Sequence, residues 1–284
     1  MKLARFRQDA GPARVGRVDG DVIVDVTELV GDSVRAVLPS LPERAAEIAA
    51  FEGDAIALSD VELLAPIDAP QKYLAIGMNY AEHTKEAAAD GIPTPKNQFW
   101  FNKQVSCINA PSGDVVRPEV SDKLDYEAEL GVVIGRECKH VSRDDAASVI
   151  GGYLVTNDFS VRDWLQKRSP TFTLGKSFDT HGPIGPWLTT ADEVEDPHNL
   201  RIRLTVNGEE RQNGLTDDMI YDIYDQIAEL TTVMTLYPGD IIATGTPSGI
   251  GAPKGVFLQP GDVVETSIEG LGSLRNVVVA EDSA

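Results

Sequence analysis

The sequence predicts a β-rich α+β fold, with a small N-terminal α+β unit and a larger main domain. Three observations support this prediction. Many short apolar runs end at glycine, proline or aspartate, few segments show helical spacing, and prolines interrupt the chain at Ala65–Pro70. Because proline resists both a helix and a central strand, we interpret that stretch as a linker between residues 1–65 and residues 71–284.

The N-terminal unit combines short strands with one helix. Three strand-like segments are separated by turns that contain glycine, proline or aspartate. These segments are Leu3–Arg7, Arg14–Val18 and Val22–Val26. A helix is predicted to follow them at about Pro42–Phe51.

The first part of the main domain contains apolar strands and two helical segments. Asn79–Ala89 is rich in helix formers, and Asn79 is its expected N-cap. Ser142 and Asp145 resemble a capping box that opens a short helix between two buried strands. The predicted strands are Tyr73–Gly77, Glu129–Gly135 and Gly152–Asp158.

The second part of the main domain begins with a β-hairpin. Arg201–Val206 and Glu209–Gln212 flank Asn207-Gly208, a dipeptide that favours a type I′ turn. Apolar residues then recur at helical spacing, which predicts an amphipathic helix over 218–235 that Pro238-Gly239 ends. Three further strands are expected near Asp240–Ala243, Val263–Ile268 and Leu274–Ala280.

The chain is strongly acidic. Its 284 residues include 45 Asp and Glu against 25 Lys and Arg, which gives a formal net charge of −20. A nucleic-acid-binding protein needs a basic face to displace phosphate counterions, and an anionic membrane surface would repel this chain. The 42% of hydrophobic residues is that of a globular protein. We therefore expect neither nucleic acid nor a membrane as a partner.

Cysteine use and the N-terminal residues indicate a cytoplasmic protein. Cys107 and Cys138 form no CxxC pair, which argues against a zinc ribbon or a disulfide framework and suggests a reducing compartment. The N-terminal residues lack the apolar stretch of a signal peptide. No uncharged apolar run reaches the roughly 18 residues that a membrane-spanning helix needs.

Two glutamates, Glu127 and Glu129, lie where an apolar strand begins. Residues i and i+2 of a strand point to the same face, so their carboxylates should project together, and Asp158 ends the next predicted strand. Three carboxylates without a nearby Cys or His favour a hard cation such as Mg²⁺ or Mn²⁺. In so acidic a chain roughly seven acidic-x-acidic pairs arise by chance, so a solvated strand edge is the alternative.

His83 and Glu86 form the second candidate group. At i and i+3 of a helix the side chains are neighbours, and the carboxylate would make the imidazole basic enough to activate water. The alternative is an exposed helical pair. Of the other histidines, His140 and His198 lie in loop-like sequence, and His181 is the one competitor as a general base.

A lysine and a glycine-rich loop are the remaining candidates. Lys176 lies in Gly175–Asp179, where it could face the carboxylates; a snorkelling surface lysine is the alternative. The loop Gly245–Gly249, which contains Thr246, could bring backbone N–H groups to an anion, or it could be a plain reverse turn. Neither feature alone identifies a function.

Taken in order, these segments resemble the fumarylacetoacetate hydrolase family. The resemblance covers about Tyr73 to Val279 and rests on six ordered motifs. They are YLAIGMNYAEH (Tyr73–His83), DYEAELGVVIG (Asp125–Gly135), GGYLVTNDFSVRD (Gly151–Asp163), GKSFDTHGPIGPW (Gly175–Trp187), VNGEERQ (Val206–Gln212) and PGDIIATGTPSGIG (Pro238–Gly251). The resemblance implies a mixed β-sandwich and β-roll catalytic domain, usually a homodimer, with Mg²⁺ or Mn²⁺ at its site.

The resemblance also implies a metal centre, residue by residue. Glu127, Glu129 and Asp158 match the metal ligands of the family. Lys176 would lie beside the metal and help to hold the substrate carboxylate or the developing enolate. These four residues would therefore form the part of the site that stabilises negative charge.

The other implied roles concern water and substrate. His83 with Glu86 would activate water, on a segment that closes as a lid in relatives. Thr246 would contact the substrate carboxylate, and Arg162 matches an arginine that follows the ligand aspartate and is expected to bind substrate. Lys103, also expected to bind substrate, ends a FWFNK segment similar to that of members acting on 2,4-dioxo-3-deoxy sugar acids.

We therefore predict a hydrolase that cleaves a C–C bond of 2,4-dioxo acids and releases pyruvate. Its substrate would resemble an acylpyruvate or a 2,4-dioxo-3-deoxy sugar acid. The alternatives are an oxaloacetate decarboxylase or a 2-oxo-hept-ene-dioate isomerase on the same enolate-stabilising site, and more remotely a non-catalytic binding relative. The short N-terminal unit is similar to that of the smaller bacterial members, which argues against fumarylacetoacetate itself as the substrate.

Overall fold

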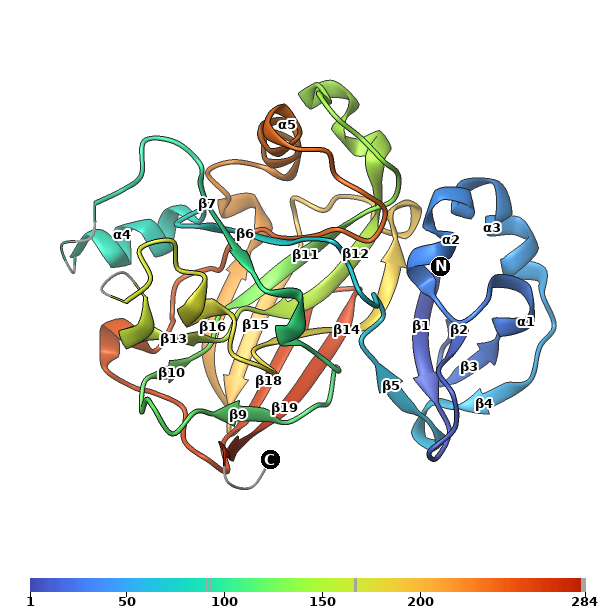
Figure 1. Ribbon diagram of the computed structural model, residues 1–284, viewed down its shortest axis with the longest axis horizontal. Coiled ribbons are helices and arrows are strands. Elements are labelled where there is room, and N and C mark those ends of the chain that lie inside the picture. Colours follow the sequence, from blue (N-terminus) through green and yellow to red (C-terminus); the bar gives the residue numbers. More distant parts are fainter. Residues whose placement is uncertain (90, 92, 166–167, 282–284) are drawn as a thin grey trace.

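The protein has the predicted β-rich α+β fold, in which two mixed sheets pack together (Figure 1). A computed structural model describes residues 1–89, 91, 93–165 and 168–281. The larger sheet has the order β4 (Ala55–Ala57), β3 (Val22–Asp25), β2 (Arg14–Asp19), β1 (Lys2–Arg7), β14 (Gly182–Thr190), β12 (Ile150–Asn157), β11 (Ala128–Ile134), β17 (Ile241–Ala243), β6 (Tyr73–Gly77) and β7 (Phe99–Lys103). In addition, β5 (Glu62–Leu64) pairs with β1 and β8 (Ile108–Asn109) pairs with β14.

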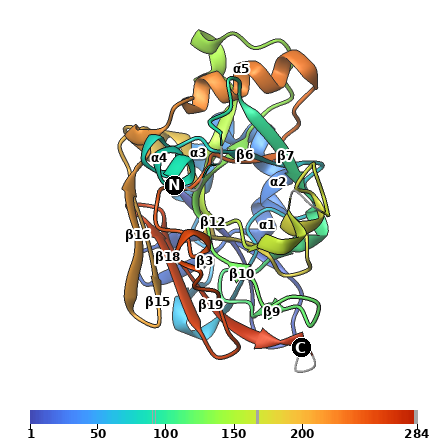
Figure 2. The same cartoon turned by 90° about the vertical axis from the view of Figure 1, so that its left-hand side faces the viewer.

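A smaller sheet covers the centre of the larger one. Its order is β16 (Glu209–Leu215), β15 (Arg201–Val206), β18 (Val263–Ile268), β19 (Gly272–Ala280) and β9 (Val115–Arg117). Separately, β10 (Leu124–Asp125) and β13 (Ser160–Val161) form a two-stranded sheet. Figure 2 shows β15, β18 and β19 side by side. Apolar residues of both sheets, among them Leu130 and Leu204, form one buried cluster. As a result β11 is buried along its whole length.

Within the described ranges, the α-helices are few and short. They are α1 (Thr27–Val30), α2 (Val34–Val37), α3 (Leu41–Ala50), α4 (Ala81–Ala89) and α5 (Ile223–Val233). Within the part of the chain that the structure describes, no helix has both the length and the apolar character to cross a membrane.

The N-terminal residues continue the larger sheet. β1 pairs with β14, with Leu3 opposite Leu188, so β1 to β4 extend the sheet to the right in Figure 1. Leu3 and Leu188 also share a buried apolar cluster. The predicted division into residues 1–65 and 71–284 stays a prediction, because the hydrogen-bonded sheet runs through both parts.

The local sequence signals for the hairpin and for one cap are confirmed. Asn207 and Gly208 have φ values of 53° and 79°, as a type I′ turn between β15 and β16 requires. Ser142 Oγ accepts the N–H of Asp145 at 3.2 Å and opens the short helix η4 (Arg143–Val149). This helix is of the 3₁₀ type.

The start of the long helix differs from the prediction. α5 begins at Ile223 rather than near residue 218. Asp222 Oδ1 accepts the N–H groups of Tyr224 and Asp225, both at 2.9 Å, so the helix begins five residues later than the apolar pattern indicated.

The expected role of Asn79 as an N-cap is wrong. Its amide donates to the carbonyls of Tyr221 and Thr244 at 3.0 and 2.8 Å, and its Oδ1 accepts the Tyr221 N–H at 2.9 Å. The N–H of Glu82 in the first turn of α4 is instead accepted by Asp218 Oδ2 at 3.0 Å. The helix is therefore anchored by a segment more than a hundred residues away, which no local pattern reveals.

Candidate metal centre and active site

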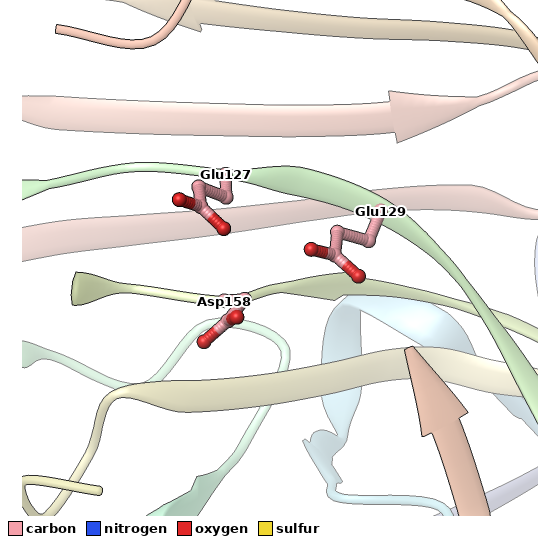
Figure 3. Close-up of side chains that lie close together, drawn as sticks. All are labelled: Glu127, Glu129 and Asp158. Carbon is pink, nitrogen blue, oxygen red and sulfur yellow. The ribbon is translucent and has the colours of Figure 1, made fainter. Parts of the chain in front are cut away.

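Three carboxylates from two adjacent strands form a buried cluster. Glu127 precedes β11, Glu129 lies within it, and Asp158 directly follows β12. The antiparallel pairing of these strands brings the three residues together, and the Asp158 N–H donates to the Glu127 carbonyl at 2.8 Å. One oxygen of each carboxylate lies within 4.8 Å of the others (Figure 3). The cluster is buried, so the solvated strand edge is not what the structure contains.

The electrostatics of the cluster suit a cation. Burial, with repulsion from Asp158 and Glu127, raises the pKa of Glu129 well above its ordinary value. Burial also opposes ionisation of Glu127, but Lys176 and Arg162 lower its pKa to about 2. A cation between the oxygens would relieve the repulsion at Glu129. Because every donor is a carboxylate oxygen, the set fits a hard divalent ion.

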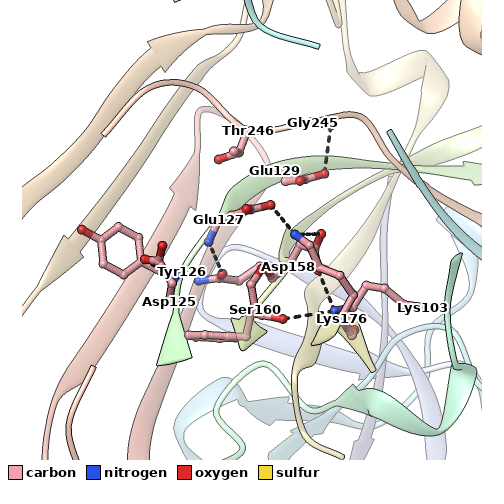
Figure 4. A network of polar contacts seen from close by, with 12 residues as sticks. Lys103, Asp125, Tyr126, Glu127, Glu129, Asp158, Ser160, Lys176, Gly245 and Thr246 are labelled. Carbon is pink, nitrogen blue, oxygen red and sulfur yellow. Dashed lines mark hydrogen bonds and ion pairs between the residues drawn. The ribbon is translucent and has the colours of Figure 1, made fainter. Parts of the chain in front are cut away.

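Two buried lysines hold the carboxylates in place (Figure 4). Lys176 Nζ lies 2.7 Å from Glu127 Oε2 and 2.7 Å from Asp158 Oδ2. Lys103 Nζ donates to Asp158 Oδ1 at 2.6 Å and to the carbonyl of Lys176 at 2.5 Å. Lys176 lines a cavity, whereas Lys103 is not among the described residues of the cavity wall. The two lysines therefore hold opposite oxygens of Asp158.

Arg162 connects the cluster to a fourth buried carboxylate. Its Nε lies 2.7 Å from Asp125 Oδ2, and its Nη1 lies 2.7 Å from Glu127 Oε1. Although burial opposes the charge, these two carboxylates raise the pKa of Arg162. Asp125 also accepts the N–H groups of Gly251 and Ala252 at 2.8 and 2.9 Å. Arg162 Nη2 is buried and has no hydrogen-bond partner within the described residues, so one donor remains for a ligand.

The charges of the site nearly balance. The carboxylates are Asp125, Glu127, Glu129 and Asp158, and the cations are Lys103, Lys176 and Arg162. With all seven groups ionised, one negative charge is left over. A divalent cation would give the group a net charge of plus one, which matches the single carboxylate of a 2-oxo acid.

His83 and Glu86 lie side by side on α4, and His83 lines the same cavity. His83 Nδ1 is 3.5 Å from Glu86 Oε2, which is longer than a strong hydrogen bond. Glu86 Oε2 accepts the Gly249 N–H at 3.2 Å, which connects α4 to the loop after β17. The His83 ring and this N–H lower the pKa of Glu86 against the opposing effect of partial burial. The pair is thus built into the site rather than exposed on a free helix face.

The glycine-rich loop is bonded to the metal-binding strand. Thr246 lines the cavity, and its hydroxyl donates to the Ala128 carbonyl at 2.9 Å and accepts from Gln212 Nε2 at 2.8 Å. The Gly245 N–H donates to Glu129 Oε2 at 2.9 Å. These contacts exclude a plain reverse turn, because the loop orients one member of the carboxylate cluster.

A cavity of about 520 Å³ unites these groups. Its polar residues are His83, Glu127, Glu129, Arg162, Lys176 and Thr246. The other three predicted site residues, Glu86, Asp158 and Lys103, each contact a member of this group or of the carboxylate cluster. The structure therefore brings together all nine side chains that the sequence singled out.

The other histidines are not placed to act in the cavity. His181 is fully buried, its Nε2 lies 2.7 Å from the Val116 carbonyl, and burial lowers its pKa to about 3. It is therefore neutral and structural. His140 and His198 lie in loops, as expected.

Three residues that position the site were not predicted. Asp125 binds the arginine, and Asn157 Oδ1 accepts the Glu127 N–H at 2.9 Å. Gln212 bonds both β11 and the glycine-rich loop. Asp125 could have been predicted from its spacing to Glu127 and Glu129, because residues i, i+2 and i+4 share a face of a strand. No local pattern distinguishes the two amides from ordinary polar residues.

Comparison with known sequences identifies the family. The profile described as "Fumarylacetoacetate (FAA) hydrolase C-terminal" matches residues 72–279, which is most of the chain. The chain belongs to the fumarylacetoacetate hydrolase family. A second profile, described as "Rv2993c-like, N-terminal", matches residues 1–66. The resemblance inferred from the six motifs is therefore confirmed.

Similar members of the family differ in the activities for which they are named. Oxaloacetate tautomerase FAHD2A, mitochondrial, of Homo sapiens is 45% identical over 224 residues, which are 78% of this chain and 70% of that protein. Maleylpyruvate hydrolase from Sphingobium sp. SYK-6 is 36% identical, with a TM-score of 0.85 over 99% of this chain and 100% of that chain, and its structure is also known with manganese(II) and pyruvate. A 2-hydroxyhepta-2,4-diene-1,7-dioate isomerase from Mycobacterium marinum is 33% identical, with a TM-score of 0.79 over 99% of each chain. The chain is thus a family enzyme whose relatives act on oxo acids, and the reaction has to be argued from the site.

Proposed function

We propose that this protein is a metal-dependent hydrolase that cleaves the C3–C4 bond of 2,4-dioxo acids and releases pyruvate. The observation that carries the proposal is the presence of His83, paired with Glu86, in the same cavity as the carboxylate cluster. The carboxylate cluster with a bound cation can stabilise an enolate, and the His83–Glu86 pair can activate water. The manganese(II) and pyruvate described for the Sphingobium relative support this reading.

The metal would be held by Glu127, Glu129 and Asp158. Their oxygen-only donor set suits Mg²⁺ or Mn²⁺, and water would complete the coordination. When bound, such an ion polarises the 2-oxo group and offsets the negative charge that develops on the pyruvate half. Lys176 adds a fixed positive charge beside Glu127 and Asp158 and would act in the same direction.

His83 would be the general base. It takes a proton from water, and the resulting hydroxide adds to the C4 carbonyl carbon. The C3–C4 bond then breaks, its electron pair moves to C3, and the pyruvate enolate accepts a proton there. The products are one carboxylic acid from the acyl half and one pyruvate. Glu86 would hold the imidazole in the tautomer that accepts the proton.

Three further residues would bind or position the substrate. The unpaired Nη2 of Arg162 would donate to the substrate carboxylate. Thr246 lines the cavity, but its hydroxyl proton is donated to the Ala128 carbonyl, so we assign it to shaping the cavity wall rather than to the hydrogen bond with the substrate carboxylate expected from the sequence. Lys103 is buried and bound to Asp158, so we assign it to positioning that carboxylate rather than to the direct substrate contact expected from the sequence.

Tautomerisation of an oxo acid is the second candidate. The human relative named oxaloacetate tautomerase favours it, and that reaction, like decarboxylation or isomerisation, needs the enolate-stabilising end of the cavity but no water nucleophile. The His83–Glu86 pair disfavours decarboxylation, which needs neither a water nucleophile nor a general base. Tautomerisation could use His83 to move a proton, so its products distinguish it from hydrolysis. A non-catalytic role is disfavoured, since all nine predicted site residues are present.

Product analysis with the full chain tests the proposal. With Mn²⁺, an acylpyruvate should yield equal amounts of pyruvate and carboxylic acid, and oxygen from isotopically labelled water should enter the carboxylic acid. EDTA should abolish turnover, and added Mn²⁺ should restore it. Conversion of enol-oxaloacetate to its keto form without hydrolysis of any 2,4-dioxo acid would establish the second candidate. Full activity after EDTA treatment would refute the metal assignment.

We also expect a homodimer, as the family resemblance implies, and a cytoplasmic location. Cys107 and Cys138 are both free, buried thiols, which is compatible with a reducing compartment. Sedimentation equilibrium of the purified chain would test the first expectation. A monomer at all concentrations would contradict it.

A further inference from the structure

The wall of the cavity has two unlike parts. The charged part contains the carboxylate cluster with Lys176 and Arg162. The remaining part is apolar, and its larger side chains include Ile76, Met78, Phe99, Phe101, Leu165 and Phe172. A ligand that fills the cavity would therefore present a charged end to one part and an apolar end to the other.

Three phenylalanines of the apolar part, Phe99, Phe101 and Phe172, pack together into an aromatic corner. Phe99 and Phe101 are two residues apart on β7, so both point to one face of the strand, and both line the cavity. Their rings lie 5.0 and 5.8 Å from the ring of Phe172. Lys176 Nζ is 5.1 Å from the Phe101 ring. The apolar wall thus begins directly beside the charged end.

The backbone fixes Phe172 relative to Lys176. The Phe172 N–H donates to the Ser169 carbonyl at 2.8 Å, and the Phe172 carbonyl accepts the Lys176 N–H at 3.1 Å. Phe172 has φ of 66°, in the left-handed region that phenylalanine rarely occupies. One turn therefore positions both a wall residue and a charged residue, so the relation between the two parts of the cavity is built into the fold.

The described apolar wall offers no counter-charge to a second anionic group. Among the described residues that line the cavity, Arg162 and Lys176 are the lysine and arginine side chains, and both bind Glu127 at the charged end. The site with a divalent cation has a net charge of plus one, which the first carboxylate of a substrate neutralises. A second carboxylate against the phenylalanines would lose its hydration without gaining a partner. Hydroxyl groups would be left without hydrogen bonds there for the same reason.

We propose that the group on C4 of the substrate is an uncharged, apolar alkyl or aryl chain. This inference rests on the proposed function and specifies its substrate class: acylpyruvates with hydrophobic acyl groups, in preference to dicarboxylic or polyhydroxylated 2,4-dioxo acids. Maleylpyruvate carries a second carboxylate, so this chain would prefer other substrates than the relative named for that compound.

A homologous substrate series tests the inference. Pyruvate release by the Mn²⁺-loaded full chain is measured for acetyl-, butanoyl- and hexanoylpyruvate and for maleylpyruvate. The value of kcat/KM should rise about three- to fourfold per added methylene, which is the gain expected from burying each CH₂. A flat or falling series, or a preference for maleylpyruvate, would overturn the inference while leaving the proposed function intact. Release of pyruvate from none of the four would instead refute the proposed function.

A charge placed in the aromatic corner sharpens the test. Phe99→Arg should lower kcat/KM for hexanoylpyruvate and raise it for maleylpyruvate, each by about tenfold, because it supplies the missing counter-charge. Asn102→Arg is the matched control, since Asn102 is exposed on the other face of β7, and it should change either value by less than about twofold.

A second variant covers the case in which Phe99→Arg does not fold. Phe99→Ala removes one ring from the apolar wall without adding a charge. Because less apolar surface is then buried against a long acyl chain, the preference for hexanoylpyruvate over acetylpyruvate should fall by about tenfold. Thermal unfolding verifies that each variant is folded. Equal losses on all substrates in a folded variant would show that the corner does not contact the acyl group, and would overturn the inference.

Discussion

The carboxylate cluster and the His83–Glu86 pair differ in how the protein supports them. The cluster lies at the adjoining ends of β11 and β12, two paired strands of the larger sheet, and buried lysines, an arginine and amides bond its members. The His83–Glu86 pair lies on a nine-residue helix whose side chains are partly exposed. Its Glu82 N–H donates to Asp218, and its Glu86 carboxylate accepts the Gly249 N–H. Just before the helix, the side chain of Asn79 bonds the segment at Tyr221.

This difference separates two functions within one cavity. The group that would hold the cation and the enolate is fixed by the sheet, so every reaction of the family that needs an enolate could use it. The group that would activate water is attached to the sheet by a few contacts. A change in α4 can therefore alter the reaction without disturbing the metal centre. Substitutions in the two regions should separate these effects.

The largest effect is expected at the metal centre. Glu129 is the cluster member without a lysine or arginine partner among the described ion pairs, so Glu129→Gln leaves no buried cation unpaired. It should lower kcat/KM roughly a thousandfold by weakening Mn²⁺ binding, with little change in the melting temperature. Steady-state kinetics and titration calorimetry with Mn²⁺ measure both. Glu229→Gln, at an exposed position on α5, is the control; unchanged Mn²⁺ affinity in Glu129→Gln would contradict the assignment.

The next effect is expected on α4. His83→Ala should lower hydrolysis by about 100- to 1,000-fold, because a general base contributes roughly that much. Mn²⁺ affinity should stay as in the unmodified protein, and any decarboxylation of oxaloacetate should decline less than hydrolysis. The two reactions are compared on the same preparation by product analysis. An equal decline of both would mean that His83 does not act on water.

Removal of the buried lysine should affect stability. Lys103→Met leaves Asp158 Oδ1 and the Lys176 carbonyl without their donor, so the free energy of unfolding should fall by about 3–5 kcal/mol. Urea unfolding measures it. Lys85→Met is the matched control, since Lys85 is exposed on α4, and its effect should stay below about 0.5 kcal/mol. A small effect at Lys103 would show that the support of the metal centre is weaker than its contacts indicate.

Acid should destabilise the sheet region through His181. Its pKa is about 3 in the folded protein and about 6.5 when unfolded, so between these values the unfolded chain binds more protons. The free energy of unfolding therefore falls as the pH drops through this window. His181 alone should lower it by about 2 kcal/mol between pH 7 and pH 5. His181→Asn should show a correspondingly flatter dependence in urea unfolding. The same slope in both proteins would exclude His181 as the source.

The smallest effect is expected at the cap of α4. Asp218→Ala removes the acceptor of the Glu82 N–H, which should cost about 1 kcal/mol of local helix stability. Hydrogen exchange should accelerate in residues 81–89 and remain unchanged in β11 and β12. Faster exchange in those strands as well would show that the two regions unfold together, and that the contrast between them is not one of stability.

The sequence was sufficient where a function depends on local spacing. The alternation of Glu127 and Glu129, the i, i+3 spacing of His83 and Glu86, and the Asn207-Gly208 turn all predicted contacts that the structure contains. Motif order then identified the family. Spacing could not reveal contacts between distant segments, because these depend on tertiary packing.

Two residues illustrate what was missed. Asn79 looked like a cap, yet its amide bonds Tyr221 and Thr244, which approach it only in the folded chain. Lys103 looked like a substrate ligand because it ends the FWFNK segment, which is similar to that of family members acting on sugar acids. The fold instead places its ammonium group behind Asp158. In both cases the side-chain type was informative, and the partner was decided by strand order.

The pairing of β1 with β14 has a consequence for the whole catalytic region. β14 is hydrogen-bonded to β12 on one side. It also pairs with β8 at its first residues and with β1 at Leu188 and Thr189, so β1 covers part of what would otherwise be an open edge beside β12. An unpaired edge offers free N–H and C=O groups to any other chain and promotes aggregation. By pairing with these groups, the N-terminal residues make them inaccessible to another chain. Their loss would first appear as insolubility, before any change in the chemistry of the cavity.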